Sequence, residues 1–187
     1  MIHADLDFIF HERDFKAIRQ AIEVYRDEPA LSFWKYQFIL PDRYNLKSRL
    51  VLAVNKAKFG DRIRFNSGGD LCQPSLDGLY INPSQIPEAR IPFYCYEKLI
   101  KTEAQVIDDV ERMADAWYRY FLHYRLGTKQ TAYKEWLKMV TGRFQKPQES
   151  ILLTDHPIYV QNTISGLKRS QWGYSGFDKL VVNNYAK

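Results

Sequence analysis

The sequence predicts a single α+β domain over residues 1–187, in which a small, mainly antiparallel sheet packs against an N-terminal helix and a central helical hairpin. Two observations predict this class. Apolar residues recur first at every second position and then at every third or fourth, which is typical of a strand followed by a helix. The chain has 187 residues, of which 15% are aromatic, enough for one well-buried core of ordinary domain size.

The first forty residues are expected to form a strand, a helix and a second strand. Segment 2–10 alternates with period two, so one face of a strand should be buried. The residues on that face are Ile2, Ala4, Leu6, Phe8 and Phe10. Helical spacing over 14–27 predicts an amphipathic helix that ends before Pro29. Its expected buried residues are Phe15, Ile18, Ile22 and Tyr25. The aromatic-rich segment 31–40 predicts the second strand.

The next part of the chain is predicted to begin with another helix. Asn45 is a suitable cap for a helix over 46–58, and Gly60 is a suitable stop. The residues expected to face inward are Leu46, Leu50, Ala53, Val54 and Ala57. A short strand is predicted at 62–65. Proline and glycine are frequent from 66 to 92, which predicts loops, with short extended pieces at 79–81 and 91–96.

The second half predicts the helical hairpin. A capping box at 102–105 begins a helix over 103–124, Gly127 ends it, and Thr128 begins a partner helix that runs to about 141. Short strands are predicted at 151–153 and 158–160. The tail over 165–185 mixes glycine and serine with aromatic residues, which predicts irregular packing.

The composition and the missing motifs exclude several classes of protein. No apolar run is long enough to span a bilayer and no signal-peptide pattern begins the chain, so we expect a cytoplasmic location and no membrane partner. Cys72 and Cys95 form no CxxC pair, so both are expected to be reduced, without zinc or a disulfide. Glycine-rich phosphate loops and zinc-protease motifs are also missing, so no cofactor and no metal are expected.

One alternative is a Mg²⁺-dependent phosphoryl-transfer enzyme. His3, Asp5 and Asp7 would project from one strand face, and paired carboxylates on a strand are typical Mg²⁺ ligands. Such a site needs another ligand, for which Asp70 or the pair 155–156 is the only candidate. The preferred interpretation is an ordinary solvated face of a half-buried sheet, and no residue is predicted to be catalytic.

Positive charge is concentrated in two parts of the chain. The net charge is +5, and basic residues cluster over 32–65 and 119–187, where aromatic residues alternate with them over 32–65. The candidate nucleic-acid-binding residues are Lys35, Arg43, Lys47, Arg49, Lys56, Lys58, Arg62, Arg64, Lys134 and Lys138. On the predicted helix 46–58, Lys47 and Lys58 fall on one flank and Arg49 and Lys56 on the opposite one, so that helix offers no single phosphate-facing stripe. Arg62 and Arg64 are expected to share one face of the strand 62–65.

The sequence therefore favours a non-enzymatic binding protein that contacts nucleic acid or a nucleoprotein complex through basic and aromatic surfaces. The alternative is a protein-binding adaptor or inhibitor, whose interface would use the same alternating blocks of charge and the exposed aromatic residues. Nothing in the sequence separates these two interpretations cleanly.

Overall fold

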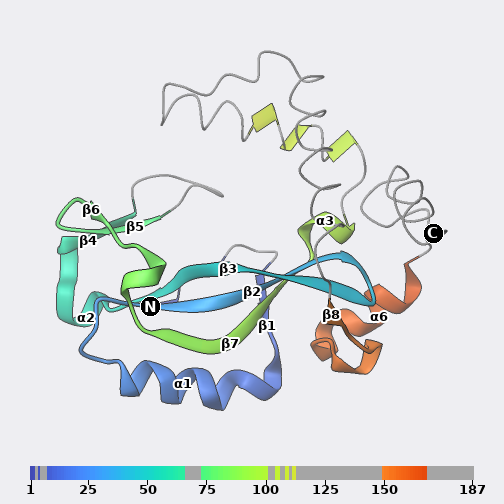
Figure 1. Cartoon of the computed structure of the whole chain (residues 1–187), viewed down its shortest axis with the longest axis horizontal. Coiled ribbons are helices and arrows are strands. Elements are labelled where there is room, and N and C mark those ends of the chain that lie inside the picture. Colours follow the sequence, from blue (N-terminus) through green and yellow to red (C-terminus); the bar gives the residue numbers. More distant parts are fainter. Residues whose placement is uncertain are drawn as a thin grey trace. The chain divides into compact units, whose positions relative to one another are not determined.

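The computed structural model describes residues 1–2, 4, 8–65, 73–100, 104–105, 108–109, 111–112 and 149–167, without the side chains at 39, 47–49, 98 and 100 (Figure 1). Helices and antiparallel strands occur together in this part, which confirms the α+β class. The chain divides into two compact units. Unit 1 comprises Met1–Gln37, Leu46–Cys95 and His156–Tyr159, and unit 2 comprises Phe38–Asn45, Tyr96–Asp155 and Val160–Lys187. The prediction of a single domain is not tested by this division and stays a prediction.

The main sheet has the strand order β1-β7-β2-β3-β8. Its strands are β1 (Phe8–Phe10), β7 (Glu88–Cys95), β2 (Ala30–Leu40), β3 (Arg43–Val54) and β8 (Glu149–Ser150). β1 is antiparallel to β7, and β8 is antiparallel to the first residues of β3. β2 runs parallel to β7 and reaches β3 through only two residues, so β2 and β3 form an antiparallel hairpin. The predicted strand over 31–40 and the mainly antiparallel sheet are confirmed.

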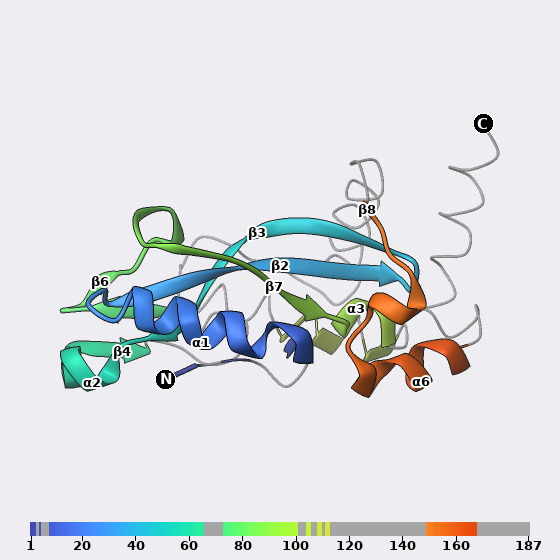
Figure 2. The ribbon, with the colours of Figure 1, turned by 90° about the horizontal axis from the view of Figure 1, so that it is seen from below.

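The N-terminal helix covers one face of the sheet in unit 1 (Figure 2). A 3₁₀ turn, η1 (Glu12–Asp14), leads into α1 (Phe15–Val24), which confirms the predicted helix. The predicted buried face is only partly right. Ile18 is buried against the sheet and Ala21 packs beside it, whereas Phe15, Ile22 and Tyr25 remain exposed. The helix is therefore rotated relative to the apolar face that its sequence predicts.

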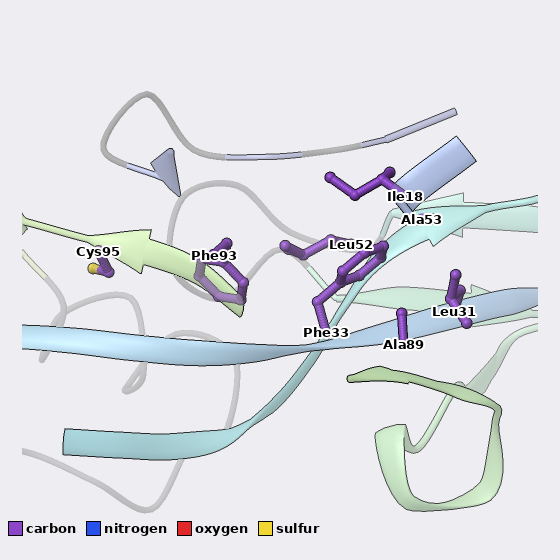
Figure 3. Packing of buried hydrophobic residues seen from close by; sticks show 8 residues of the cluster. All are labelled: Ile18, Leu31, Phe33, Leu52, Ala53, Ala89, Phe93 and Cys95. Carbon is purple, nitrogen blue, oxygen red and sulfur yellow. The ribbon is translucent and has the colours of Figure 1, made fainter. Parts of the chain in front are cut away.

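Aromatic rings from three strands form the main core of unit 1. Phe33, Phe93 and Leu52 are buried beneath Ile18 of α1 (Figure 3). The ring centroid of Phe10 lies 5.4 Å from that of Phe33 and 6.3 Å from that of Phe93. Cys95 is buried at the edge of this cluster, and its Sγ accepts from Gln37 Nε2 at 3.5 Å. Edge-to-face ring contacts of this kind add to the stabilisation from apolar burial.

The predicted helix over 46–58 is wrong, because residues 43–54 form the strand β3. The same apolar residues satisfy two periods: Leu46, Leu50 and Val54 recur at four-residue spacing, and together with Leu52 they also fall on alternate positions of a strand. The tight connection to β2 decides between the two periods. Asn55, not Asn45, caps the short helix α2 (Lys56–Phe59) by accepting a hydrogen bond from the Lys58 amide.

A small second sheet follows α2 in unit 1. After the 3₁₀ turn η2 (Gly60–Arg62), the strands β4 (Ile63–Phe65), β5 (Pro74–Leu76) and β6 (Leu79–Tyr80) pair antiparallel in this order. The predicted strands at 62–65 and 79–81 are thus confirmed within one or two residues, and η4 (Pro83–Gln85) follows. A second apolar cluster anchors this sheet. Its buried members are Ala30, Val54, Ile63 and Ile81.

Unit 2 has its own aromatic contacts and short helices. Phe38 is buried and stacks on Tyr96 with ring centroids 4.8 Å apart. The described helices that begin or lie in this unit are α3 (Glu97–Ile100), η5 (Leu153–Asp155) and most of α6 (Ile158–Gly166). The strands predicted at 151–153 and 158–160 are wrong. Pro157 has the fixed φ of a helix start, so the chain continues as a helix. Of the predicted helix 103–124, the described residues 104–105, 108–109 and 111–112 are helical, and the rest of the predicted hairpin and most of the predicted irregular tail lie outside the described residues.

A carboxylate joins α6 to the start of α1 within unit 1. Both oxygens of Glu12 accept from the Ile158 amide, at 3.2 and 3.3 Å. Burial alone raises the pKa of Glu12, but hydrogen bonds from the Glu12 and Ile158 amides and the nearby His11 and Arg13 outweigh it, and the pKa lies below its ordinary value of 4.5. A lowered pKa stabilises the fold above pH 4.5, and this contribution is lost as the pH falls through the folded value.

We therefore expect the Ile158 amide to exchange with solvent faster as the pH falls below about 4.5, beyond the intrinsic pH dependence of exchange. Hydrogen exchange monitored by mass spectrometry or NMR measures this protection. Glu12→Gln keeps an oxygen acceptor but cannot ionise, so its protection should show no such step. An identical pH profile in both proteins would contradict the role of Glu12.

Candidate nucleic-acid interface

Four of the six predicted cations with described side chains lie on one short stretch of unit 1, from α2 to β4. Lys56 points back over η2, where its Nζ donates to the carbonyls of Gly60 and Ile63 at 2.8 and 3.0 Å and lies 3.7 Å from Asp61 Oδ1. These contacts fix the turn between α2 and β4. Lys56 therefore has a structural role in this turn besides its charge.

Lys58 is paired with Asp27 in the turn that follows α1. Its Nζ donates to Asp27 Oδ1 at 2.8 Å and to the Asp27 carbonyl at 3.1 Å. The hydrogen bond from Lys58, and then its charge, lower the pKa of the Asp27 carboxyl. Both side chains remain largely exposed, so this pair contributes little to stability and stays accessible to solvent.

Arg62 is held by the turn between β5 and β6. Its guanidinium donates to both oxygens of Asp77, Nε at 3.0 Å and Nη2 at 2.7 Å. The hydrogen bond from Arg62 lowers the pKa of Asp77, and the same contact raises the pKa of Arg62. Asp77 and Gly78 both have positive φ, 52° and 82°, as a two-residue hairpin turn of the primed type requires. The bidentate pair therefore ties the end of η2 to the tip of the β5–β6 hairpin.

Arg64 differs from its neighbours. It is exposed, its Nε donates only to the Asp61 carbonyl at 3.2 Å, and within the described part of the chain no carboxylate pairs with its guanidinium. Strand register places Arg64 opposite Ser75, and Ser75 opposite Tyr80. Residues paired in this way lie on the same face of a sheet. Arg64 and Tyr80 therefore flank Ser75 on one face, and the Tyr80 side chain is 52% exposed. We call these two residues the Arg64–Tyr80 face.

The other candidate cations lie elsewhere. Lys35 is half-buried on β2, with its Nζ 4.6 Å from the centre of the Phe8 ring. Arg43 begins β3 in unit 2 and lies 3.8 Å from Asp42. Positions 47 and 49 belong to the strand β3, so the opposed flanks expected of a helix do not apply to them. Lys134 and Lys138 lie outside the described residues.

The structure also bears on the metal and membrane predictions. His3, Asp5, Asp7 and Asp70 lie outside the described residues, and His156 is fully buried. Among the residues that are described, no cluster of His, Cys, Asp and Glu side chains could hold a metal ion. No helix in the described part of the chain is long and apolar enough to cross a membrane.

Sequence reasoning missed Tyr80 and the carboxylate partners of the cations. The Asp77–Gly78 dipeptide was the available signal, because it favours a two-residue hairpin and so predicts that 79–80 pairs with 75–76. The register between β4 and β5 could not be predicted from the sequence, because no tight turn joins these two strands. Comparisons with protein-family models, with curated proteins and with solved structures find no match to this chain.

Proposed function

We propose that this chain is a nucleic-acid-binding protein, acting alone or within a nucleoprotein complex, and that the Arg64–Tyr80 face is its contact surface. The proposal rests on one observation: an exposed arginine that no carboxylate of the described residues pairs with shares a sheet face with an exposed tyrosine. A guanidinium binds phosphate oxygens in a bidentate manner, and an aromatic ring stacks on a base. These are the two contacts that a single strand requires.

The spacing of the face suits a single strand. Arg64 and Tyr80 are two strands apart, so their backbones are about 10 Å from one another at the usual strand separation of about 4.8 Å. Side chains of this length can reach a base and a neighbouring phosphate across that distance. A base inside a duplex is already stacked on both sides, so an exposed tyrosine gains most from an unpaired strand.

The cations that are paired with aspartates add less net positive charge to this surface than Arg64 does. Lys58 and Arg62 lie on the same α2–β4 segment, but each has an aspartate within hydrogen-bonding distance. Exposed ion pairs are weak and are screened by salt, so a phosphate can replace the aspartate at low cost. We infer modest affinity, with Arg64 as the principal phosphate contact.

The test is a titration of fluorescently labelled single-stranded DNA and RNA of mixed sequence, followed by anisotropy over a range of salt concentrations. We expect the logarithm of the association constant to fall linearly with the logarithm of the salt concentration, because each neutralised phosphate releases counterions. Tyr80→Ala should reduce affinity by roughly fivefold to a hundredfold, in line with about 1–3 kcal/mol per stacked base. Arg64→Ala should reduce both affinity and the salt slope.

Matched controls come from exposed residues outside the face. Arg90 is an exposed arginine on β7 and Tyr25 an exposed tyrosine at the end of α1, so Arg90→Ala and Tyr25→Ala should bind as the parent does. Undetectable binding at low salt, or equal losses in the control and test variants, would refute the proposal.

A change at Asp77 should strengthen binding. Asp77→Asn removes the charge that holds Arg62 while keeping a residue that tolerates the positive φ of this turn. The freed guanidinium can then contact a phosphate, so affinity for single-stranded DNA should rise severalfold and the salt slope should steepen by about 1. The same titration measures both quantities, and weaker binding by Asp77→Asn would contradict this arrangement.

A further inference from the structure

The outward side of α1 is a second surface, unrelated to the Arg64–Tyr80 face. Figure 2 looks onto the side of α1 that faces away from the sheet. Phe15 and Ile22, seven residues apart and therefore on one line of the helix, are 45% and 40% exposed. Helix α1 is already fixed to the sheet by Ile18 and Ala21, so these two apolar side chains are not needed to hold it there.

Uncompensated positive charge lies beside these apolar residues. Lys16 and Arg19 are exposed, and no carboxylate of the described residues pairs with either of them. The one acidic residue within α1, Glu23, is instead bound by Arg26 at 3.0 Å. The four residues Phe15, Lys16, Arg19 and Ile22 thus form an apolar strip with a basic flank, which we call the α1 surface.

We propose that the α1 surface docks an acidic amphipathic helix of a partner protein. An apolar ridge at i and i+7 packs into the groove of another helix, and acidic residues beside that groove would complement Lys16 and Arg19. A lipid surface fits less well, because α1 is only 10 residues long and its other apolar side is taken up by the sheet. Nucleic acid would satisfy the two cations but would leave the aliphatic Ile22 without a matching contact.

Site-specific photocross-linking of the full chain, carried out inside the cells that produce the protein, tests this inference. Benzoylphenylalanine is placed at Ile22, and as a control at Gln20, which is exposed on another side of the same helix. We expect cross-links from position 22 at least tenfold above those from position 20. Mass spectrometry should map them to a protein segment with apolar residues at helical spacing and an excess of Asp and Glu.

Two sets of variants make the outcome decisive. Lys16→Glu combined with Arg19→Glu should abolish these cross-links, and a synthetic peptide of the mapped segment should bind Phe15→Ala about three- to tenfold more weakly than the parent. Arg64→Ala combined with Tyr80→Ala should leave the cross-links unchanged, so a failure of the nucleic-acid proposal is distinguishable from a failure here. Cross-links to nucleic acid, to lipid or to a segment without excess acid would overturn the inference, as would none above the control.

Discussion

Phe33→Ala is expected to lower the free energy of unfolding by about 3–5 kcal/mol, the usual cost of removing a buried phenylalanine ring. Phe33 is fully buried at the centre of the main cluster of unit 1, between Leu52 and the Phe10 ring. The neighbouring rings belong to paired strands and cannot move far inward, so a cavity should remain. Urea denaturation followed by circular dichroism measures the loss as a lower midpoint with an unchanged slope.

Phe15→Ala is the matched control, since it removes the same ring from an exposed position of α1. We expect a change within about 0.5 kcal/mol, because surface substitutions of this kind have small effects and alanine favours a helix. A comparable loss of stability in both variants would mean that α1 lies on the sheet in a different rotation from the one described.

The elements that the sequence predicts correctly are those whose pattern fits only one period. β2 is bounded by Pro29 and Pro41 and is rich in aromatic residues, and α1 has apolar residues at helical spacing only. β3 fits two periods, and its strand state depends on pairing with β2. The side of α1 that faces the sheet depends on the bulky rings beneath the helix. The exposure of Phe15 and Ile22 could therefore not be predicted either.

The candidate site shows the same limit. The sequence identifies Lys58 and Arg62 as cations, but their carboxylate partners are 31 and 15 residues away along the chain. Such pairings follow from how loops close, which composition does not determine. The exposed guanidinium of Arg64 and its alignment with Tyr80 depend on the register of three strands. Charge clustering therefore predicts the neighbourhood of the site, and the fold determines which cation is available to a ligand.

Phe38→Ala is expected to have an effect of similar size, about 3–5 kcal/mol, in unit 2. Phe38 is fully buried, stacks on Tyr96 and lies 5.7 Å from the Tyr44 ring. It lies on the same strand as Phe33, five positions further along β2, but Phe33 belongs to unit 1 and Phe38 to unit 2. The two variants therefore perturb the two units separately.

This pair of variants tests the predicted single domain. β2 and β3 each contribute residues to both units, so loss of structure in one unit should remove strand pairing that the other requires. We expect calorimetry to show one cooperative transition, shifted down by both substitutions, with equal calorimetric and van't Hoff enthalpies. Two transitions, one lowered only by Phe33→Ala and the other only by Phe38→Ala, would instead show that the units unfold independently. In that case the Arg64–Tyr80 face and the α1 surface, both in unit 1, should survive Phe38→Ala. Under a single cooperative fold, both should be lost at the same temperature.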